Sequence, residues 1–332
     1  MADNIADKFG RAVQYLRISV TDRCNLRCVY CMPEHGLPYE TRDHILTVDE
    51  ITRLVTLLAE HGLCKVRITG GEPLVRGDDV VELVARLNSV PAINDIGLTT
   101  NAVLLERYAP RLREAGLKRI NISVDTLRPE RFAKIARFDK FNETQAGLAA
   151  AKAAGFAPIK LNTVVMRGVN DDEIVDFARL TLDYAYHVRF LEYMPIGQVT
   201  PHEWRAKYVS NECLIDKLHD SFDLAPLDTA VSSTAKRLKI AGALGFIEVV
   251  SPISHKFCAG CNRLRLTANG ALVPCLSDNF EYDIKTPLRA GATDDELLDH
   301  VRAALSHKPE QSDFEGRVIR GGSLRIMAQI GG

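Results

Sequence analysis

A short β-rich run recurs six times between residues 13 and 194, and amphipathic helical patterns lie between the runs. The β-rich runs cover 13–20, 65–69, 95–100, 119–125, 159–165 and 187–194. The helical patterns cover 47–62, 79–88, 104–115, 143–154 and 171–184. Because strand, helix and next strand form right-handed crossovers, this alternation predicts an α/β fold with a parallel sheet. The repeats suit a doubly wound sheet or an incomplete barrel, and periodicity alone does not choose between them.

The pattern changes after residue 195. A helical stretch near 211–219 is followed by β-like segments at 236–242 and 245–253. A hairpin signal follows at 264–275, with Asn269-Gly270 as a two-residue turn. One more helix is predicted at 293–306, and its first turn carries a capping box. We therefore predict two domains, a larger one at residues 1–195 and a smaller one at 196–332.

The composition excludes several classes of protein. The formal net charge of −1 over 332 residues gives no basic surplus that would favour nucleic acid or an anionic membrane. No apolar stretch approaches the roughly 18 residues that span a bilayer, and the first residues lack the apolar core of a secretory signal. We therefore expect a cytoplasmic protein with reduced thiols, whose eight cysteines serve as metal ligands or catalytic groups.

Most of these cysteines fall into two sets of three. The sets are C-x3-C-x2-C, at Cys24, Cys28 and Cys31, and C-x2-C-x13-C, at Cys258, Cys261 and Cys275. The remaining two, Cys64 and Cys213, stand alone, and we expect them to be small core residues because free cysteine is usually buried.

The first set is one ligand short of a closed metal site. A structural zinc site takes four ligands, and a ferredoxin-type run carries a further cysteine before proline, where this chain has Met32-Pro33. An iron–sulfur cube held by three thiolates leaves one iron open, which is useful only if a small molecule binds there. A zinc loop that lacks a ligand is the alternative.

The spacing, with Tyr30 before the last cysteine, resembles the signature of the radical S-adenosylmethionine superfamily. The resemblance implies that S-adenosylmethionine chelates the open iron and yields a 5′-deoxyadenosyl radical, while the protein aims the radical and excludes water. GGEP at 70–73 resembles the motif that holds the methionine amino group, at Gly71. Tyr30, Ser123 and Met194 match further contacts of S-adenosylmethionine.

The second set leaves two chemistries open. A second cluster with an open iron is one, and a zinc site with His255 as fourth ligand is the other. CNRLRL at 261–266 favours the cluster, because Arg263 and Arg265 alternate on a strand, face the same way and suit a polyanion.

Three more cations lie on predicted strands, where interior positions are normally apolar. They are Arg17, Arg67 and Lys160. A phosphorylated substrate would supply their partner, and internal ion pairs are the alternative. The chain has neither a G-x4-GK[ST] loop nor a G-x-G-x2-G fingerprint, so a nucleotide would lie on separate Arg and Lys side chains.

The order of motifs over the whole chain resembles the GTP 3′,8-cyclase family of molybdenum cofactor biosynthesis. These motifs are the first cysteine set, RITGGEP, GLTTN, EYMP, CNRLRL with Cys275, and the final GG. The resemblance implies an incomplete (β/α)6 TIM-like barrel and a C-terminal domain that carries a second [4Fe-4S] cluster. It implies that GTP is converted to (8S)-3′,8-cyclo-7,8-dihydroguanosine 5′-triphosphate through hydrogen abstraction at ribose C3′ and attack on guanine C8.

The family's functional residues carry over position by position. The resemblance implies catalytic roles for Cys24, Cys28, Cys31, Arg17, Arg263 and Arg265. The implied GTP contacts are Arg17, Arg67, Thr99, Lys160, Arg263, Leu264 and Arg265. Implied partners are a second copy of the chain, a downstream cyclic pyranopterin phosphate synthase, and a reductant such as flavodoxin or ferredoxin.

Two positions depart from the family pattern. Ala102 follows TTN where glycine is common, and 308–314 lacks a histidine often present there. Gly331-Gly332 resembles the diglycine that reaches the family's active site. Two other functions remain possible, a radical enzyme that acts on a peptide and a zinc module that binds a partner protein.

Overall fold

The computed structural model describes residues 4–197, 199–229, 233–320 and 325–331. Its strands are β1 (Tyr15–Ser19), β2 (Lys65–Thr69), β3 (Asp95–Thr100), β4 (Arg119–Ser123), β5 (Ile159–Val165), β6 (His187–Glu192), β7 (Leu224–Leu227), β8 (Ala235–Ile240), β9 (Phe246–Val250), β10 (Arg263–Leu266), β11 (Ala271–Val273) and β12 (Tyr282–Asp283). The six predicted β-rich runs are therefore confirmed as β1 to β6.

Most of the α-helices lie at positions that the periodicity predicts. They are α1 (Val48–Glu60), α2 (Asp78–Asn88), α3 (Leu105–Glu114), α4 (Pro129–Ala136), α5 (Phe141–Ala153), α6 (Ile174–Asp183), α7 (Pro201–Lys207), α8 (Asn211–His219), α9 (Lys285–Arg289), α10 (Asp294–Ser306), α11 (Phe314–Ile319) and α12 (Met327–Ile330), with 3-10 turns η1 (Arg42–His44) and η2 (Pro73–Arg76). The capping boxes of α1 and α10 are confirmed, at Thr47 with Glu50 and at Thr293 with Glu296. Helix α4 is an element that the sequence reading did not predict.

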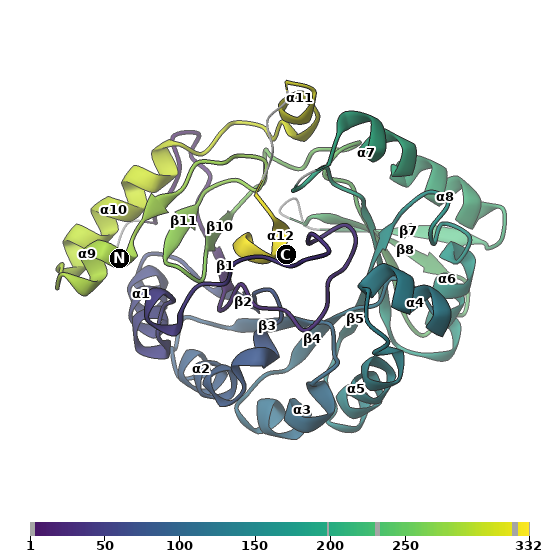
Figure 1. Ribbon diagram of the computed structural model, residues 1–332, viewed down its shortest axis with the longest axis horizontal. Coiled ribbons are helices and arrows are strands. Elements are labelled where there is room, and N and C mark those ends of the chain that lie inside the picture. Colours follow the sequence, from purple (N-terminus) through teal and green to yellow (C-terminus); the bar gives the residue numbers. More distant parts are fainter. Residues whose placement is uncertain (1–3, 198, 230–232, 321–324, 332) are drawn as a thin grey trace.

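All of the strands join one 12-stranded sheet, in the order β12-β11-β10-β1-β2-β3-β4-β5-β6-β9-β8-β7. Strands β10 and β9 come from the C-terminal part of the chain, yet they pair in parallel with β1 and β6. The sheet thus continues without a break across residue 195. Figure 1 shows the strands following an arc, with α1, α2, α3, α5 and α6 outside it and α12 inside.

The outer face of the central strands supplies the apolar core against the helices. In β1, Leu16 and Ile18 are fully buried on that face, and Val66 and Ile68 repeat the pattern in β2. Arg17 lies between them in sequence, so it points to the inner face of the arc. Parallel strands usually carry apolar residues on both faces, so charged inner residues mark the concave side as a binding surface.

The hairpin of β10 and β11 differs from its predicted turn. The backbone of Thr267 donates to the carbonyl of Ala271 at 2.9 Å, and Ala268, Asn269 and Gly270 lie between them. The prediction of a two-residue turn was wrong because the Thr267 hydroxyl also accepts from the Ala271 amide, which favours a wider turn with Gly270 at φ +80°.

No helix in the described ranges combines the length and the apolar character needed to cross a bilayer.

A buried carboxylate ties together the strands on one side of the sheet. Glu248, 1% exposed on β9, accepts from Lys160 Nζ at 2.8 and 3.0 Å, from Arg189 Nε at 2.7 Å and from Arg237 Nε at 3.1 Å. Burial alone would raise the pKa of Glu248, but the hydrogen bond from His187 and the charges of Arg189 and Lys160 hold it far below its usual value. The carboxylate therefore stays ionised and links β5, β6, β8 and β9.

We predict that Glu248→Gln lowers the free energy of unfolding at pH 7 by about 3 kcal/mol or more, because it leaves buried cations without their carboxylate. The loss should be full above the ordinary glutamate pKa of about 4.3 and should shrink as pH falls toward the lower folded value. Urea unfolding followed by circular dichroism measures it, with the exposed Glu60→Gln as the control. Equal midpoints for the two variants would contradict the prediction.

Candidate active site

The inner face of the arc encloses a cavity of about 370 Å³ at the carboxyl ends of the central strands. Both cysteine sets line it, through Cys24, Cys28, Cys31, Cys258, Cys261 and Cys275. The two sets are therefore brought to one cavity although more than two hundred residues separate them in sequence. The lone cysteines lie elsewhere, and the expectation that both are core residues was wrong, since Cys213 is exposed and Cys64 is only half-buried.

The first cysteine loop is held in place by α4. The backbone amides of Arg27 and Val29 donate to the carbonyls of Ala136 and Ile135, each at 3.0 Å. The Arg137 guanidinium at the end of α4 donates to the carbonyls of Arg27 at 3.1 Å and Met32 at 2.9 Å. The loop is thus shaped by a helix that lies far from it in the sequence.

The thiols of this loop sit in an environment that disfavours bare thiolates. Burial raises the pKa of Cys24 to about 11 and that of Cys31 to about 12, and it raises the pKa of Cys28 as well. The nearby carboxylates Glu72 and Asp125 add to these shifts. Three thiols of this kind fit a strongly cationic group, because binding a metal cluster removes their protons and supplies the missing positive charge.

The glycines of GGEP have a packing role that differs from the expected one. A Cβ on Gly71 would lie 2.4 Å from the Arg23 carbonyl oxygen, and one on Gly70 would lie 2.6 Å from that of Thr21. The Gly71 amide donates to Thr21 at 2.6 Å. These glycines therefore let the loop after β2 pack against the segment that leads into Cys24. Gly71 still lines the cavity.

The second cysteine set has cationic surroundings. Burial would raise the pKa of Cys261, but the charges of Lys308 and Arg263 lower it below the ordinary thiol value. Arg11 donates to the Cys258 carbonyl at 3.0 Å. The two sets thus differ in electrostatic character, with carboxylates around the first and cations around the second.

The zinc alternative fits this geometry poorly. His255 does not line the cavity and pairs with Glu212 at 3.0 Å. A zinc ion with Zn–S bonds of roughly 2.3 Å needs its ligands packed around one point, and the described residues contain no group of three His, Cys, Asp or Glu so arranged.

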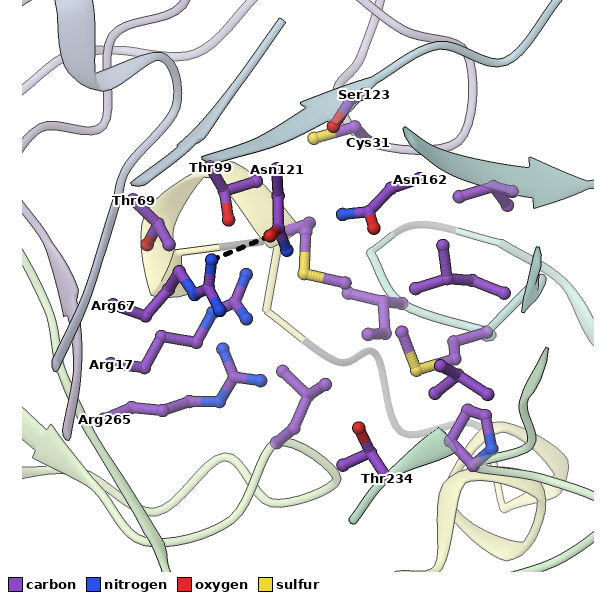
Figure 2. A pocket seen from close by; sticks show the side chains of 18 of the residues that line it. Arg17, Cys31, Arg67, Thr69, Thr99, Asn121, Ser123, Asn162, Thr234 and Arg265 are labelled. Carbon is purple, nitrogen blue, oxygen red and sulfur yellow. Dashed lines mark hydrogen bonds between the residues drawn. The ribbon is translucent and has the colours of Figure 1, made fainter. Parts of the chain in front are cut away.

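Three arginines form a row across neighbouring strands, in the cavity that both cysteine sets line. Arg17 on β1 is directly beside Arg67 on β2 and Arg265 on β10 in the strand registers. Figure 2 shows the three guanidinium groups close together in the cavity. Arg67 donates to Asn121 Oδ1 at 2.9 Å, and burial together with the charge of Arg17 lowers the pKa of Arg265 to about 9. A row of like charges in a buried cavity favours a polyanionic ligand.

Tyr15 belongs to the same row, although the sequence reading did not single it out. Its hydroxyl lies 3.4 Å from Arg67 Nε. Burial alone would raise the pKa of Tyr15, but the charges of Arg67 and Arg17 lower it to about 7.

Three further residues, Asn121, Asn162 and Arg189, also line the cavity and were not predicted, because an isolated polar residue on a strand gives no motif.

Most of the sequence-predicted contacts lie in the cavity wall. The predicted residues that line it beyond the cysteines are Arg17, Tyr30, Arg67, Gly71, Thr99, Ser123, Met194, Arg263 and Arg265. Thr99 Oγ1 and Asn162 Oδ1 are buried and have no hydrogen-bond partner among the described residues, which suits a polar ligand. Lys160 does not line the cavity, because Glu248 holds its ammonium group. Leu264 faces the opposite side of β10 and is fully buried.

Ala102 adopts a left-handed backbone, with φ of 64°. Glycine adopts this conformation without the steric cost that a Cβ brings, so the departure noted at this position places alanine where glycine would fit more easily. Its amide donates to Thr100 Oγ1 at 3.0 Å, and this turn follows the strand that carries Thr99. The backbone of the loop is therefore retained with alanine in place.

The segment around α12 occupies one side of the cavity. The Gly331 carbonyl accepts from Arg17 Nε at 3.0 Å and from Arg265 Nη1 at 2.7 Å. Gly331 has φ of +75°, and a Cβ there would lie 2.4 Å from Thr69 Oγ1. The expected approach of a diglycine to the site thus holds for Gly331, whereas Gly332 lies outside the described residues.

We predict that Gly331→Ala displaces this segment from the arginine row, because the added methyl group collides with Thr69. Amide hydrogen exchange of residues 326–331 should become at least about tenfold faster, as expected when roughly 1.4 kcal/mol of local stability is lost. Gly168→Ala is the matched control, since Gly168 has φ of +70° but open space around its Cβ position. Unchanged exchange in Gly331→Ala would mean that the segment accommodates the methyl group.

Both parts of the chain match known protein families. Residues 18–181 match the radical SAM superfamily, and residues 186–314 match the family described as Molybdenum Cofactor Synthesis C. A protein of Heliobacterium modesticaldum named GTP 3′,8-cyclase is 48% identical over 98% of this chain and 99% of its own length. A protein of the same name from Desulforamulus reducens is 46% identical over 98% of this chain and 99% of its own length.

A mouse protein named molybdenum cofactor biosynthesis protein 1 is 45% identical over 92% of this chain, which corresponds to 48% of the mouse protein. Among solved structures, Streptococcus suis SuiB bound to S-adenosylmethionine superposes with a TM-score of 0.62 at 14% identity, over 94% of this chain and 76% of that one. This likeness shows the radical SAM fold alone. The near full-length identity to the two bacterial relatives is decisive, and this chain belongs to the GTP 3′,8-cyclase family of the radical SAM superfamily.

Proposed function

We propose that this protein converts GTP to (8S)-3′,8-cyclo-7,8-dihydroguanosine 5′-triphosphate by radical S-adenosylmethionine chemistry, the first step of molybdenum cofactor biosynthesis. The observation that carries the proposal is that the row of Arg17, Arg67 and Arg265 and two sets of three cysteines line one cavity. The names of the relatives at 48% and 46% identity support the same reaction.

Two [4Fe-4S] clusters fit the two cysteine sets. Cys24, Cys28 and Cys31 would hold the first, with S-adenosylmethionine beside Tyr30, Gly71, Ser123 and Met194. Cys258, Cys261 and Cys275 would hold the second, which faces the substrate. When bound, the first cluster and S-adenosylmethionine supply the 5′-deoxyadenosyl radical that abstracts hydrogen from ribose C3′ of GTP.

The arginine row would bind the triphosphate. Guanidinium groups form paired hydrogen bonds with phosphate oxygens and are positively charged at pH 7, so Arg17, Arg67 and Arg265 suit that task. Arg263, on the same face of β10 as Arg265, would lie closer to the second cluster. Thr99 Oγ1 is available to a polar group of the substrate, since no described residue bonds to it.

Lys160 would reach GTP only with a rearrangement. Its ammonium group is bound by Glu248, whereas Arg189, which shares that carboxylate, lines the cavity. A phosphate that approached Arg189 would compete with Glu248 for these cations. Lys160 is therefore proposed to contact the substrate after the triphosphate binds.

The polypeptide would divide into a partial (β/α)6 barrel at residues 1–195 and a domain for the second cluster at 196–332. The sheet order, with β9 and β10 at the flanks of β1 to β6, supports a barrel that is completed by strands of the C-terminal part. We further propose a cytoplasmic homodimer that takes electrons from a reductant such as flavodoxin or ferredoxin. Its product would pass to cyclic pyranopterin phosphate synthase.

Oxygen-free incubation with GTP, S-adenosylmethionine and dithionite tests the reaction. We expect 5′-deoxyadenosine and a new chromatographic peak with the mass of GTP, because the hydrogen atom lost from C3′ is replaced by one electron from dithionite and one proton. Cys24→Ala should abolish both, because the first cluster then lacks a ligand. The exposed Cys213→Ala is the matched control and should retain activity. Cleavage of S-adenosylmethionine without any change in GTP would contradict the proposed substrate.

Substitution in the arginine row tests the substrate site separately. Arg265→Gln should weaken GTP binding at least about tenfold, because a hydrogen bond to a charged group contributes roughly 1.5–3 kcal/mol. Equilibrium binding of radiolabelled GTP measures the effect, and iron content per chain checks that the clusters remain. Arg302→Gln, on the exposed side of α10, is the control. Equal affinities of the two variants would remove the arginine row from the substrate site.

A further inference from the structure

Lys308 is a buried cation whose function the reaction above does not explain. It lies after α10 and is 2% exposed. Its Nζ donates to the carbonyl of Arg263 at 2.7 Å and to that of Cys261 at 3.3 Å. Both acceptors are neutral, so these hydrogen bonds orient the ammonium group without cancelling its charge.

No carboxylate of the described residues forms an ion pair with Lys308. Asp7 is a nearby acid, but it is bound by Arg11 Nε at 2.6 Å. Arg11 itself reaches the Cys258 carbonyl, so one carboxylate serves two cations behind the second cysteine set. A buried ammonium that shares its nearby carboxylate with a second cation is costly, and its presence indicates a further anion at this place in the working protein.

The second cysteine set supplies such an anion once it holds a cluster. A four-iron cube bound by three thiolates carries net negative charge, and gaining one electron adds another negative charge. Cys261, whose carbonyl accepts from Lys308, is one of those thiolates. A fixed positive charge at this distance stabilises the reduced form more than the oxidised form.

The first cysteine set has the opposite surroundings. Glu72 and Asp125 are the carboxyl groups that act on Cys24 and Cys28 most strongly, and burial raises the pKa of Glu72 to about 7 and that of Asp125 to about 6. Negative charge near a cluster disfavours its reduction, which suits a cluster that must be a strong reductant to cleave a sulfonium bond. The cavity would then hold two clusters of unequal reduction potential.

We propose that Lys308 is the counter-charge of the second iron–sulfur cluster and raises the reduction potential of that cluster. The inference rests on the second cluster of the proposed function. Lys308 acts as a positioning and tuning residue, since it contacts the backbone of Cys261 and Arg263 rather than substrate. Because Arg263 lies two residues before Arg265, the same contact couples the cluster to the strand that carries the substrate arginines.

The test uses the full chain with Cys24, Cys28 and Cys31 replaced by alanine, so that only the second cluster is present. A titration with dithionite, followed by electron paramagnetic resonance, gives the reduction potential of that cluster. We expect Lys308→Met and Lys308→Gln to shift the oxidised-to-reduced ratio at a fixed potential at least tenfold toward the oxidised form, a lowering of about 59 mV. Lys308→Arg should restore most of the potential, and the exposed Lys118→Met should leave it unchanged.

Lys308→Gln keeps an N–H donor without the charge, whereas Lys308→Met removes both. An unshifted potential in Lys308→Gln or Lys308→Met would overturn the inference. Loss of iron in both neutral variants but not in Lys308→Arg would mean that the positive charge is needed to hold the cluster. This outcome supports the inference. Loss of iron in all three variants would assign Lys308 a purely structural role and overturn it. A background protein without iron would overturn the second cluster itself, and the inference with it.

Discussion

The structure depends on a row of like charges placed inside a sheet. Arg17, Arg67 and Arg265 occupy matched positions on three adjoining parallel strands, where apolar residues are usual. Three guanidinium groups at this spacing repel one another, and burial with the neighbouring Arg17 lowers the pKa of Arg265 to about 9. A bound polyanion would offset this repulsion. The arginine row therefore destabilises the empty cavity and favours the state with a ligand bound.

The two cysteine sets that line the cavity with this row differ in electrostatic character. Carboxylates lie near Cys24 and Cys28, whereas Lys308 and Arg263 lie near Cys261. Strands β1 and β10 are direct neighbours although they are far apart in the chain, so Arg17 and Arg265 lie side by side. The pairing of β10 with β1 therefore brings Arg265 to the same cavity that both cysteine sets line.

The central strands and the first cysteine set could be predicted from the sequence, because the patterns that indicate them span only a few neighbouring residues. The strands β1 to β6 follow from β-rich runs between helical periods, and the spacing of Cys24, Cys28 and Cys31 resembles the signature of the superfamily that the comparison confirms. The parallel pairing of β9 and β10 with the central strands could not be predicted, since no short-range pattern records which distant strands meet. Helix α4 was missed for a related reason, as its eight residues are too few for a clear period.

The substrate residues show the same limit. The alternation in Arg263-Leu264-Arg265 predicts that the two arginines share a face, and both line the cavity. Lys160 was expected beside them, yet its position against Glu248 depends on a residue 88 positions away. Tyr15 and Lys308 carry no motif at all, and their meaning comes from the charges that the fold brings near them. The role of a side chain that depends on residues distant in sequence can therefore be recognised only in the structure.

The most direct test of the account is the metal content of the protein prepared without oxygen. Iron and sulfide should be present in equal amounts, and wild type should contain twice the iron of a variant in which Cys258, Cys261 and Cys275 are replaced by alanine. S-adenosylmethionine should change the Mössbauer spectrum of that variant, because one iron of its remaining cluster is open. Zinc at either cysteine set, or a variant with as much iron as wild type, would contradict the account.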